Sequence, residues 1–204
     1  MTLEQELSFF YKRNGFGDVP GSRPLTVSVY TGCMLVPMPN IETRRVFLKY
    51  HDLHHLITGY SVGRIGEAEV SGWELGTGSA FVSPTLGVMN LIALSTGLVL
   101  EPKRMWRAYR RGCLSRNLYA PADRAAVDSG RWQDIASLRQ EVLEVRRAAI
   151  PAVRALEFGF YSAAAIVIHA GIAIPAVIAR FVTDIMLGYS VFQAVKPKKR
   201  SDLY

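Results

Sequence analysis

Cysteine is scarce in this chain of 204 residues, which has only Cys33 and Cys113, far apart in the sequence. A small secreted domain held by disulfides is therefore excluded, and this usage is typical of a reducing compartment. The first ten residues, MTLEQELSFF, also lack a basic stretch. They contain Glu4 and Glu6, so they match neither a signal peptide nor an Arg-rich transit peptide. We expect a bacterial-type protein on the cytoplasmic side of a membrane.

Recognisable nucleic-acid-binding motifs are also missing, although the formal net charge is +7. The basic residues are spread along the chain, and several lie beside apolar stretches or in the KPKKR sequence near the C-terminus. This distribution suits an anionic membrane surface. We therefore expect a membrane surface or bilayer as a partner, and no nucleic acid.

Charged residues are absent from the stretch Phe158–Ala179, FGFYSAAAIVIHAGIAIPAVIA. About twenty apolar residues are enough to cross the hydrocarbon core of a bilayer. The stretch predicts a helix or shallow hairpin embedded in a membrane, and the alternative is a buried helix of a lipid-binding protein. His169, Gly171 and Pro175 weaken the membrane-spanning interpretation.

The remaining signals predict helices joined by one extended segment. Residues 1–12 are expected to form an amphipathic helix. Residues 13–40 are rich in glycine and proline, which predicts an extended, wrapping segment with a strand at Thr26–Tyr30.

The histidine-rich stretch is predicted to lie on a helix over residues 41–58, between an N-cap at Asn40 and a stop at Gly59. A second helix is expected over residues 65–75. A further helix is expected to begin at a cap formed by Asp128–Ser129. Its apolar stripe would contain Trp132, Ile135, Leu138, Val142 and Val145.

Three of the four histidines lie in the sequence HDLHH, residues 51–55. A helix turns by about 100° per residue, so His55 falls about 40° and Asp52 about 100° from His51. These three side chains converge and can bind one divalent metal ion, such as zinc. His54 falls beside the apolar residues and is a poorer ligand candidate.

Glu67 can supply a fourth ligand, because the glycine-containing turn after His55 lets a second helix begin at an angle. Glu74 lies on the same face as Glu67, where it is expected to contact a ligand or carry a proton. The simpler alternative is a solvated polar helix face. HDLHH also matches the histidine box of membrane desaturases, but His169 alone cannot supply the further boxes. The additional ligands of His-Asp phosphohydrolases are not found either.

The stretch HDLHHLITGY…GEAEVSGWELGTG resembles the "coenzyme Q four" family of ubiquinone biosynthesis, whose signature is H-D-x-x-H, then Glu after eleven residues. The stretches MWRAYRRGCLSRNLY and GRWQDIASLRQEVL are similar to the second block of that family. The similarity covers residues 41–145. It implies that His51, Asp52, His55 and Glu67 bind a divalent metal, with zinc expected.

The resemblance also implies an all-helical fold with an apolar tunnel for a polyprenyl lipid, and association with other quinone-biosynthesis enzymes at a membrane. The family is implicated in replacing a ring carboxyl of a polyprenylated benzoate by a hydroxyl. If this chain is an enzyme, we expect a lyase or oxidative decarboxylase of a polyprenyl hydroxybenzoate. Its metal would act as a Lewis acid or as a structural clip. The alternatives are a non-catalytic isoprenoid-binding scaffold and a small membrane protein.

Arg116, Asn117 and Tyr119 form a second polar cluster, which is expected to bind a lipid head group; a capped turn is the alternative. We predict an all-α protein with a single helical domain, an apolar lipid tunnel and a C-terminal hydrophobic helix that can embed in a membrane. The N-terminal helix with its wrapping segment, the metal-binding core, and the apolar helix with its basic tail would be residues 1–40, 41–150 and 151–204.

Overall fold

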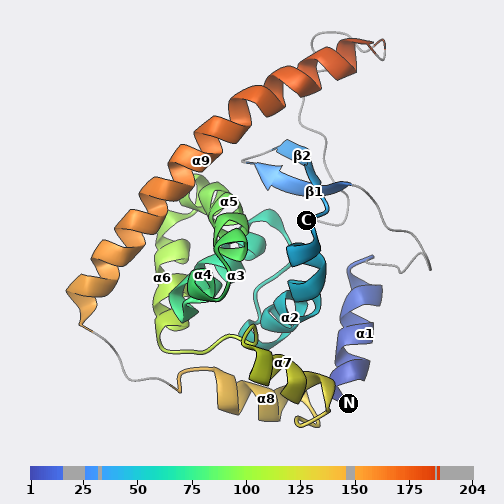
Figure 1. The fold of residues 1–204 in the computed structure, drawn as a ribbon, viewed down its shortest axis with the longest axis vertical. Helices are drawn as coiled ribbons and strands as arrows, with labels where there is room; N and C mark the ends of the chain where they lie inside the picture. Colours follow the sequence, from blue (N-terminus) through green and yellow to red (C-terminus); the bar gives the residue numbers. More distant parts are fainter. Residues whose placement is uncertain (16–25, 32–33, 146–149, 187, 189–204) are drawn as a thin grey trace.

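A computed structural model describes the chain over residues 1–15, 26–31, 34–145, 150–186 and 188. This part is helical apart from one hairpin, which confirms the predicted fold class (Figure 1). The helices are α1 (Leu3–Arg13), α2 (Glu42–Thr58), α3 (Arg64–Thr77), α4 (Ser79–Val82), α5 (Pro84–Leu100), α6 (Pro102–Cys113), α7 (Pro121–Asp128), α8 (Ile135–Val142) and α9 (Pro151–Met186). The hairpin consists of β1 (Thr26–Thr31) and β2 (Met34–Pro39).

The N-terminal region contains the predicted helix and strand. The Thr2 hydroxyl accepts a hydrogen bond from the Gln5 N–H, and the Gln5 side chain accepts one from the Thr2 N–H, so a capping box starts α1. β1 confirms the expected strand. β2 was not predicted, because its prolines argue against pairing. A strand in a two-stranded hairpin has one free edge, and there a missing N–H costs little.

The helix that carries the histidines ends as predicted but begins differently. Gly59 closes α2 in the left-handed conformation, with φ at 80°. Ile41, not Asn40, is the N-cap, so the predicted cap is wrong. The Asn40 side chain instead accepts a hydrogen bond from the Arg44 guanidinium.

The prediction that a helix begins at Asp128–Ser129 is also wrong. α7 ends at Asp128, and α8 begins at Ile135. Asp134 is the N-cap of α8, and its carboxylate accepts a hydrogen bond from the Ser137 N–H at 2.8 Å. The three-residue spacing of Trp132 and Ile135 imitates a helical stripe, although Trp132 lies before the helix and is buried by tertiary packing.

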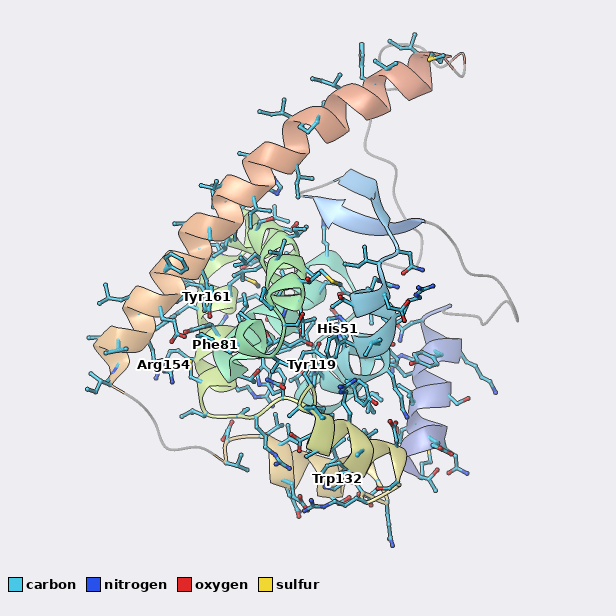
Figure 2. The ribbon with its side chains drawn as sticks, in the orientation of Figure 1. His51, Phe81, Tyr119, Trp132, Arg154 and Tyr161 are labelled. Carbon is cyan, nitrogen blue, oxygen red and sulfur yellow. The ribbon has the colours of Figure 1, made fainter. Side chains whose placement is uncertain are left out.

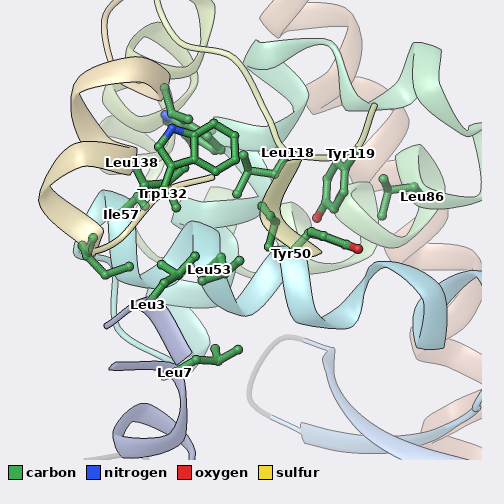
Figure 3. Close-up of a cluster of buried hydrophobic side chains, with 14 of the residues drawn as sticks. Leu3, Leu7, Tyr50, Leu53, Ile57, Leu86, Leu118, Tyr119, Trp132 and Leu138 are labelled. Carbon is green, nitrogen blue, oxygen red and sulfur yellow. The ribbon is translucent and has the colours of Figure 1, made fainter. Parts of the chain in front are cut away.

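Two clusters of buried apolar side chains form the core. The first joins α1, α2 and the α7–α8 region, and Figure 3 shows Leu3, Leu53, Trp132 and Leu138 within it. The second joins α3, α5, α6 and α9. α3 contributes Trp73 to the first cluster and Leu75 to the second, so this central helix links both halves of the core.

α3 packs closely against α6 because glycines remove side chains from their contact. A Cβ at Gly76 would lie 2.3 Å from the Tyr109 carbonyl oxygen, and one at Gly112 would lie 2.0 Å from the Trp73 carbonyl oxygen. Both clashes are with backbone atoms, which cannot rotate away. The spacing of these two helices therefore depends on Gly76 and Gly112.

α9 runs along one side of the molecule, past α6 and α5, and extends beyond them (Figure 1). The segment Pro151–Ile172 is long and apolar enough to cross a membrane, and only 11% of its apolar window is buried. The alternative of a helix buried in the core is therefore wrong. Cys113 is a buried free thiol. Cys33 and the KPKKR tail lie outside the described residues.

Candidate metal centre

α2 and α3 bring three predicted ligands together. His51 and His55 lie one turn apart in α2, and Glu67 lies in the first turn of α3, where the helix dipole favours negative charge. The turn before α3 folds tightly against Gly66, because a Cβ there would lie 1.9 Å from the Ser61 carbonyl oxygen. α3 therefore starts close to α2 and presents Glu67 to the histidines.

The distances within this group fit a metal ion. His51 Nε2 lies 3.3 Å from Glu67 Oε2, and His55 Nε2 lies 3.6 Å from Glu67 Oε1. One ligand atom from each of the three residues lies within 4.8 Å of the other two. Two ligand atoms on a tetrahedral zinc ion, each bound at about 2.1 Å, lie roughly 3.4 Å apart. His51, His55 and Glu67 can therefore hold a metal ion.

Hydrogen bonds fix the orientation of both histidine rings. His51 Nδ1 lies 2.9 Å from Glu74 Oε1, and His55 Nδ1 lies 3.1 Å from the Tyr60 carbonyl oxygen. A proton on each Nδ1 leaves the lone pair on Nε2, which is the nitrogen near Glu67. His55 Nε2 is buried and has no hydrogen-bond partner among the described residues, as suits a metal ligand. This arrangement of imidazole and outer acceptor is usual at metal sites.

Glu74 is fully buried and accepts several hydrogen bonds at one oxygen. Its Oε1 lies 2.7 Å from His54 Nδ1 and 2.6 Å from the Tyr119 hydroxyl, in addition to the contact with His51. His54 Nε2 accepts a hydrogen bond from the Leu118 N–H at 3.0 Å. Both nitrogens of His54 are therefore engaged, and His54 supports the site without serving as a ligand. Figure 2 labels His51 and Tyr119 within the helical body.

The charges of the site favour a cation. Burial tends to raise the pKa values of Glu67 and Glu74, but the neighbouring histidines outweigh burial and hold both far below their usual range. Burial opposes a charge on His51, yet Glu74 and Glu67 raise its pKa well above the ordinary value. Burial lowers the pKa of His54, which is therefore neutral. Two carboxylates facing His51 stabilise either a proton or a metal ion there.

Asp52 does not join the other three predicted ligands. It is buried, and burial raises its pKa although His51, His55 and a hydrogen bond with Tyr11 of α1 oppose that rise. Its helical position, a quarter turn from His51, places its carboxylate beside α1. The structure thus brings together three of the four expected ligands, and Asp52 is a buried neighbour of that trio.

The other predicted cluster separates into different environments. Arg116 forms ion pairs with Asp123 and Glu141. Asn117 donates to the Thr77 hydroxyl and accepts from the N–H of Tyr119, so it holds the turn. Tyr119 is buried against Glu74. These contacts match the capped-turn alternative and bring only Tyr119 to the metal centre.

Sequence patterns missed two neighbours of the site. The ring of Phe10 in α1 stacks on the His55 ring, with centroids 6.1 Å apart, so α1 covers one side of the ligands. Arg44 interacts electrostatically with Asp52 and Glu67. Arg44 could have been found, since it lies seven residues before His51 on the same helical face. The contact of Phe10 with His55 could not have been predicted, because no local sequence pattern indicates where α1 packs.

No family model, curated protein or solved structure matches the chain in comparisons with known proteins. The site is therefore defined by its own geometry: two histidines and one carboxylate, on two adjacent helices, with their outer hydrogen bonds in place.

Proposed function

We propose that this chain is a metal-binding, prenyl-lipid-handling protein of ubiquinone-type quinone biosynthesis. The observation that carries the proposal is the trio His51, His55 and Glu67, whose spacing and oriented rings suit a divalent cation. The resemblance of residues 41–145 to the ubiquinone-biosynthesis family supplies the substrate class. The uncharged helix α5 and the uncharged stretch Phe158–Ala179 of α9 supply apolar surface for a prenyl tail, which is almost insoluble in water.

Zinc is the ion we favour, because a two-histidine, one-glutamate set is typical of catalytic zinc sites with positions left for water or substrate. The same donor types also bind non-haem iron(II), so the metal assay must distinguish the two. When bound, the ion would act as a Lewis acid toward an anionic oxygen of the ring. Three protein ligands favour this role over that of a structural clip.

The residues around the trio have distinct roles in this proposal. Glu74 holds His51 in position, and its burial keeps water from that hydrogen bond. Arg44 places positive charge beside Glu67, where it would attract the carboxylate of an aromatic acid. Exchange of that carboxyl for a hydroxyl converts carboxylate and water to phenol, carbon dioxide, one proton and two electrons. An external two-electron acceptor must therefore be present in any assay. The partners would be other quinone-biosynthesis enzymes at the cytoplasmic face of the membrane.

Metal analysis of the purified full chain tests the proposal. We expect about one zinc or iron ion per chain, lost in His51→Ala and in Glu67→Gln. His169→Ala is the matched control, because His169 contacts Ser95 at 2.9 Å, away from the trio. Asp52→Asn should keep the ion if the site has three protein ligands. Native protein without any metal, or loss of metal in the His169 variant alone, would remove the proposal.

A non-catalytic isoprenoid-binding scaffold is the second candidate, favoured by the exposed apolar side chains of α9. Lipid extraction followed by mass spectrometry should identify a bound isoprenoid in either case. Incubation with a prenylated hydroxybenzoate, metal and an electron acceptor separates the two. Conversion that is lost in His51→Ala supports the enzyme, whereas binding without conversion supports the scaffold.

A further inference from the structure

α9 presents an apolar stripe to its surroundings along its whole described length. Every residue of α9 that is described as exposed is apolar. The most exposed members include Leu156 at 77%, Phe160 at 72% and Val167 at 71%. At about 100° per residue, these and Val153, Ile174 and Ile178 fall within one sector of roughly 60°. Such a continuous exposed surface marks a binding face.

The polar side chains of α9 that the structure describes lie on its other side, toward the body of the protein. Arg154 and Glu157 form an ion pair, and His169 contacts Ser95 of α5 at 2.9 Å. Tyr161 is buried against Tyr109 of α6. The usual polarity of a surface helix is therefore reversed. This inner packing also shows that α9 is attached to the body while its stripe faces outward.

A cationic row lies on α6, the helix that packs against the inner face of α9. Lys103, Arg107 and Arg110 are exposed on one face of α6, and α6 contains no acidic residue. Trp106 of α6 connects the row to α9: its ring contacts Phe158 at 5.2 Å, and the Arg110 guanidinium lies 5.8 Å from the same ring. An exposed apolar stripe on α9, together with an exposed cationic row on the neighbouring α6, suits a bilayer with anionic lipids.

We propose that α9 lies in the plane of an anionic membrane, with its apolar stripe in the interface and the α6 row against lipid phosphates. The chain could instead cross the membrane, since Pro151–Ile172 is long enough. Crossing would require α9 to leave α5 and α6, or would draw the Arg154–Glu157 pair and the attached body into hydrocarbon. In-plane binding keeps every described contact. This inference rests on the proposed membrane association but not on the metal site.

Vesicle co-sedimentation of the full chain tests the surface. Vesicles of phosphatidylcholine with phosphatidylglycerol should bind the protein much more tightly than phosphatidylcholine alone, and salt should weaken binding. Phe160→Glu with Val167→Glu should lower the partition coefficient at least about tenfold, because both apolar side chains leave the interface. Phe9→Glu is the control, because Phe9 is exposed on α1, which lies across the molecule from α9 (Figure 1). Equal losses in the control would overturn the assignment.

The cationic row is tested separately. Lys103→Gln with Arg107→Gln should reduce binding to the anionic vesicles by about tenfold and flatten its salt dependence. The matched control, Lys12→Gln with Arg13→Gln, removes two exposed cations from the end of α1 and should change little. Metal content should stay unchanged in all these variants, which separates failure of this inference from failure of the proposed function.

Depth measurements separate in-plane binding from crossing. Single spin labels at Leu156, Phe160, Val167 and Ile174, in a background with both cysteines changed to alanine, should report one similar, shallow depth. A depth that rises and then falls along α9 would show a crossing helix and overturn the proposal. In a different outcome, the native chain binds no vesicles and forms a stable dimer in lipid-free buffer. If Phe160→Glu with Val167→Glu converted that dimer to a monomer, the apolar stripe would be a contact between two copies of the chain, and the membrane proposal would be overturned.

Discussion

At the scale of single residues, the candidate metal centre depends on a buried carboxylate outside the proposed ligand trio. Glu74 connects His51, His54 and Tyr119 through one oxygen. Because this oxygen accepts the Nδ1 proton of His51, the Nε2 lone pair lies on the side of Glu67. Removing the charge of Glu74 would leave the ligand in place but weaken the hydrogen bond that orients it.

Glu74→Gln should therefore bind zinc about tenfold to a hundredfold more weakly than the native chain. Titration with a competing chromophoric chelator measures this affinity. Glu69→Gln is a matched control on the same helix, because Glu69 pairs with Arg104 outside the trio. Equal weakening in both variants would indicate a general loss of stability and contradict the orienting role.

Asp128, at the junction of α7 and α2, makes a pH-dependent contribution to the stability of the fold. Its carboxylate accepts from Lys49 at 2.7 Å and from Tyr50 at 2.8 Å, and these contacts hold its pKa below the ordinary value. A carboxylate whose pKa is lowered by folding stabilises the protein above its unfolded pKa. That stability is lost as the pH falls through the lower folded pKa.

Asp128→Asn should thus lower the free energy of unfolding at pH 7 by about 1 kcal/mol or less, since the pair is half exposed. The difference from the native chain should shrink below the ordinary pKa of aspartate. Urea unfolding at both acidic and neutral pH measures it. Glu4→Gln serves as the control, because Glu4 is exposed on α1. A difference that grows at acidic pH would contradict the sign of this linkage.

At the scale of secondary-structure elements, the contact of α3 with α6 limits what the fold tolerates. Gly76→Ala or Gly112→Ala would push a methyl group into backbone carbonyls of the facing helix. We expect each to destabilise the protein by about 1–3 kcal/mol, as overpacking usually does. Thermal or urea unfolding measures the loss.

Gly159→Ala is the natural comparison for these two variants. Gly159 lies in α9, and a Cβ there would meet no atom within 4 Å. The same substitution should therefore be neutral, or stabilising by about 0.5–1 kcal/mol, because alanine favours helices. If all three variants were equally stable, close packing of α3 and α6 would not be required.

At the scale of the whole molecule, the candidate metal centre lies between a helix of one half of the core and the helix that links both halves. α2 belongs to the first cluster, whereas α3 contributes to both. An ion bound by His51, His55 and Glu67 would tie α2 to α3. Each cluster has its own buried apolar side chains, so the helices should stay folded when the ion is removed.

Zinc added at about 100 times its dissociation constant should raise the free energy of unfolding by roughly 2.7 kcal/mol, and a chelator should reverse this gain. Thermal unfolding with circular dichroism measures both the gain and the retained helix content. His51→Ala should unfold at the same temperature with or without zinc. Loss of helical signal on chelation alone would contradict the independence of the core.

Much of this protein could be read from local sequence. The spacing of His51 and His55 placed two ligands on one face, because a helix repeats every 3.6 residues whatever surrounds it. Gly59 stopped α2 through its own backbone freedom. The uncharged stretch of α9 was evident from composition alone. By contrast, Asp134 rather than Asp128–Ser129 caps the next helix, since local capping signals occur at both ends of helices.

Only the tertiary structure decided how these elements meet. It separated Asp52 from the ligand trio, divided Arg116 from Tyr119, and placed Phe10 against His55. Sequence determined that α9 is apolar, but packing on α5 and α6 determined which side faces outward. Periodicity fixes the relative directions of side chains within one helix. It carries no information on which helix lies alongside, because that depends on burial contributed by residues far apart in the chain.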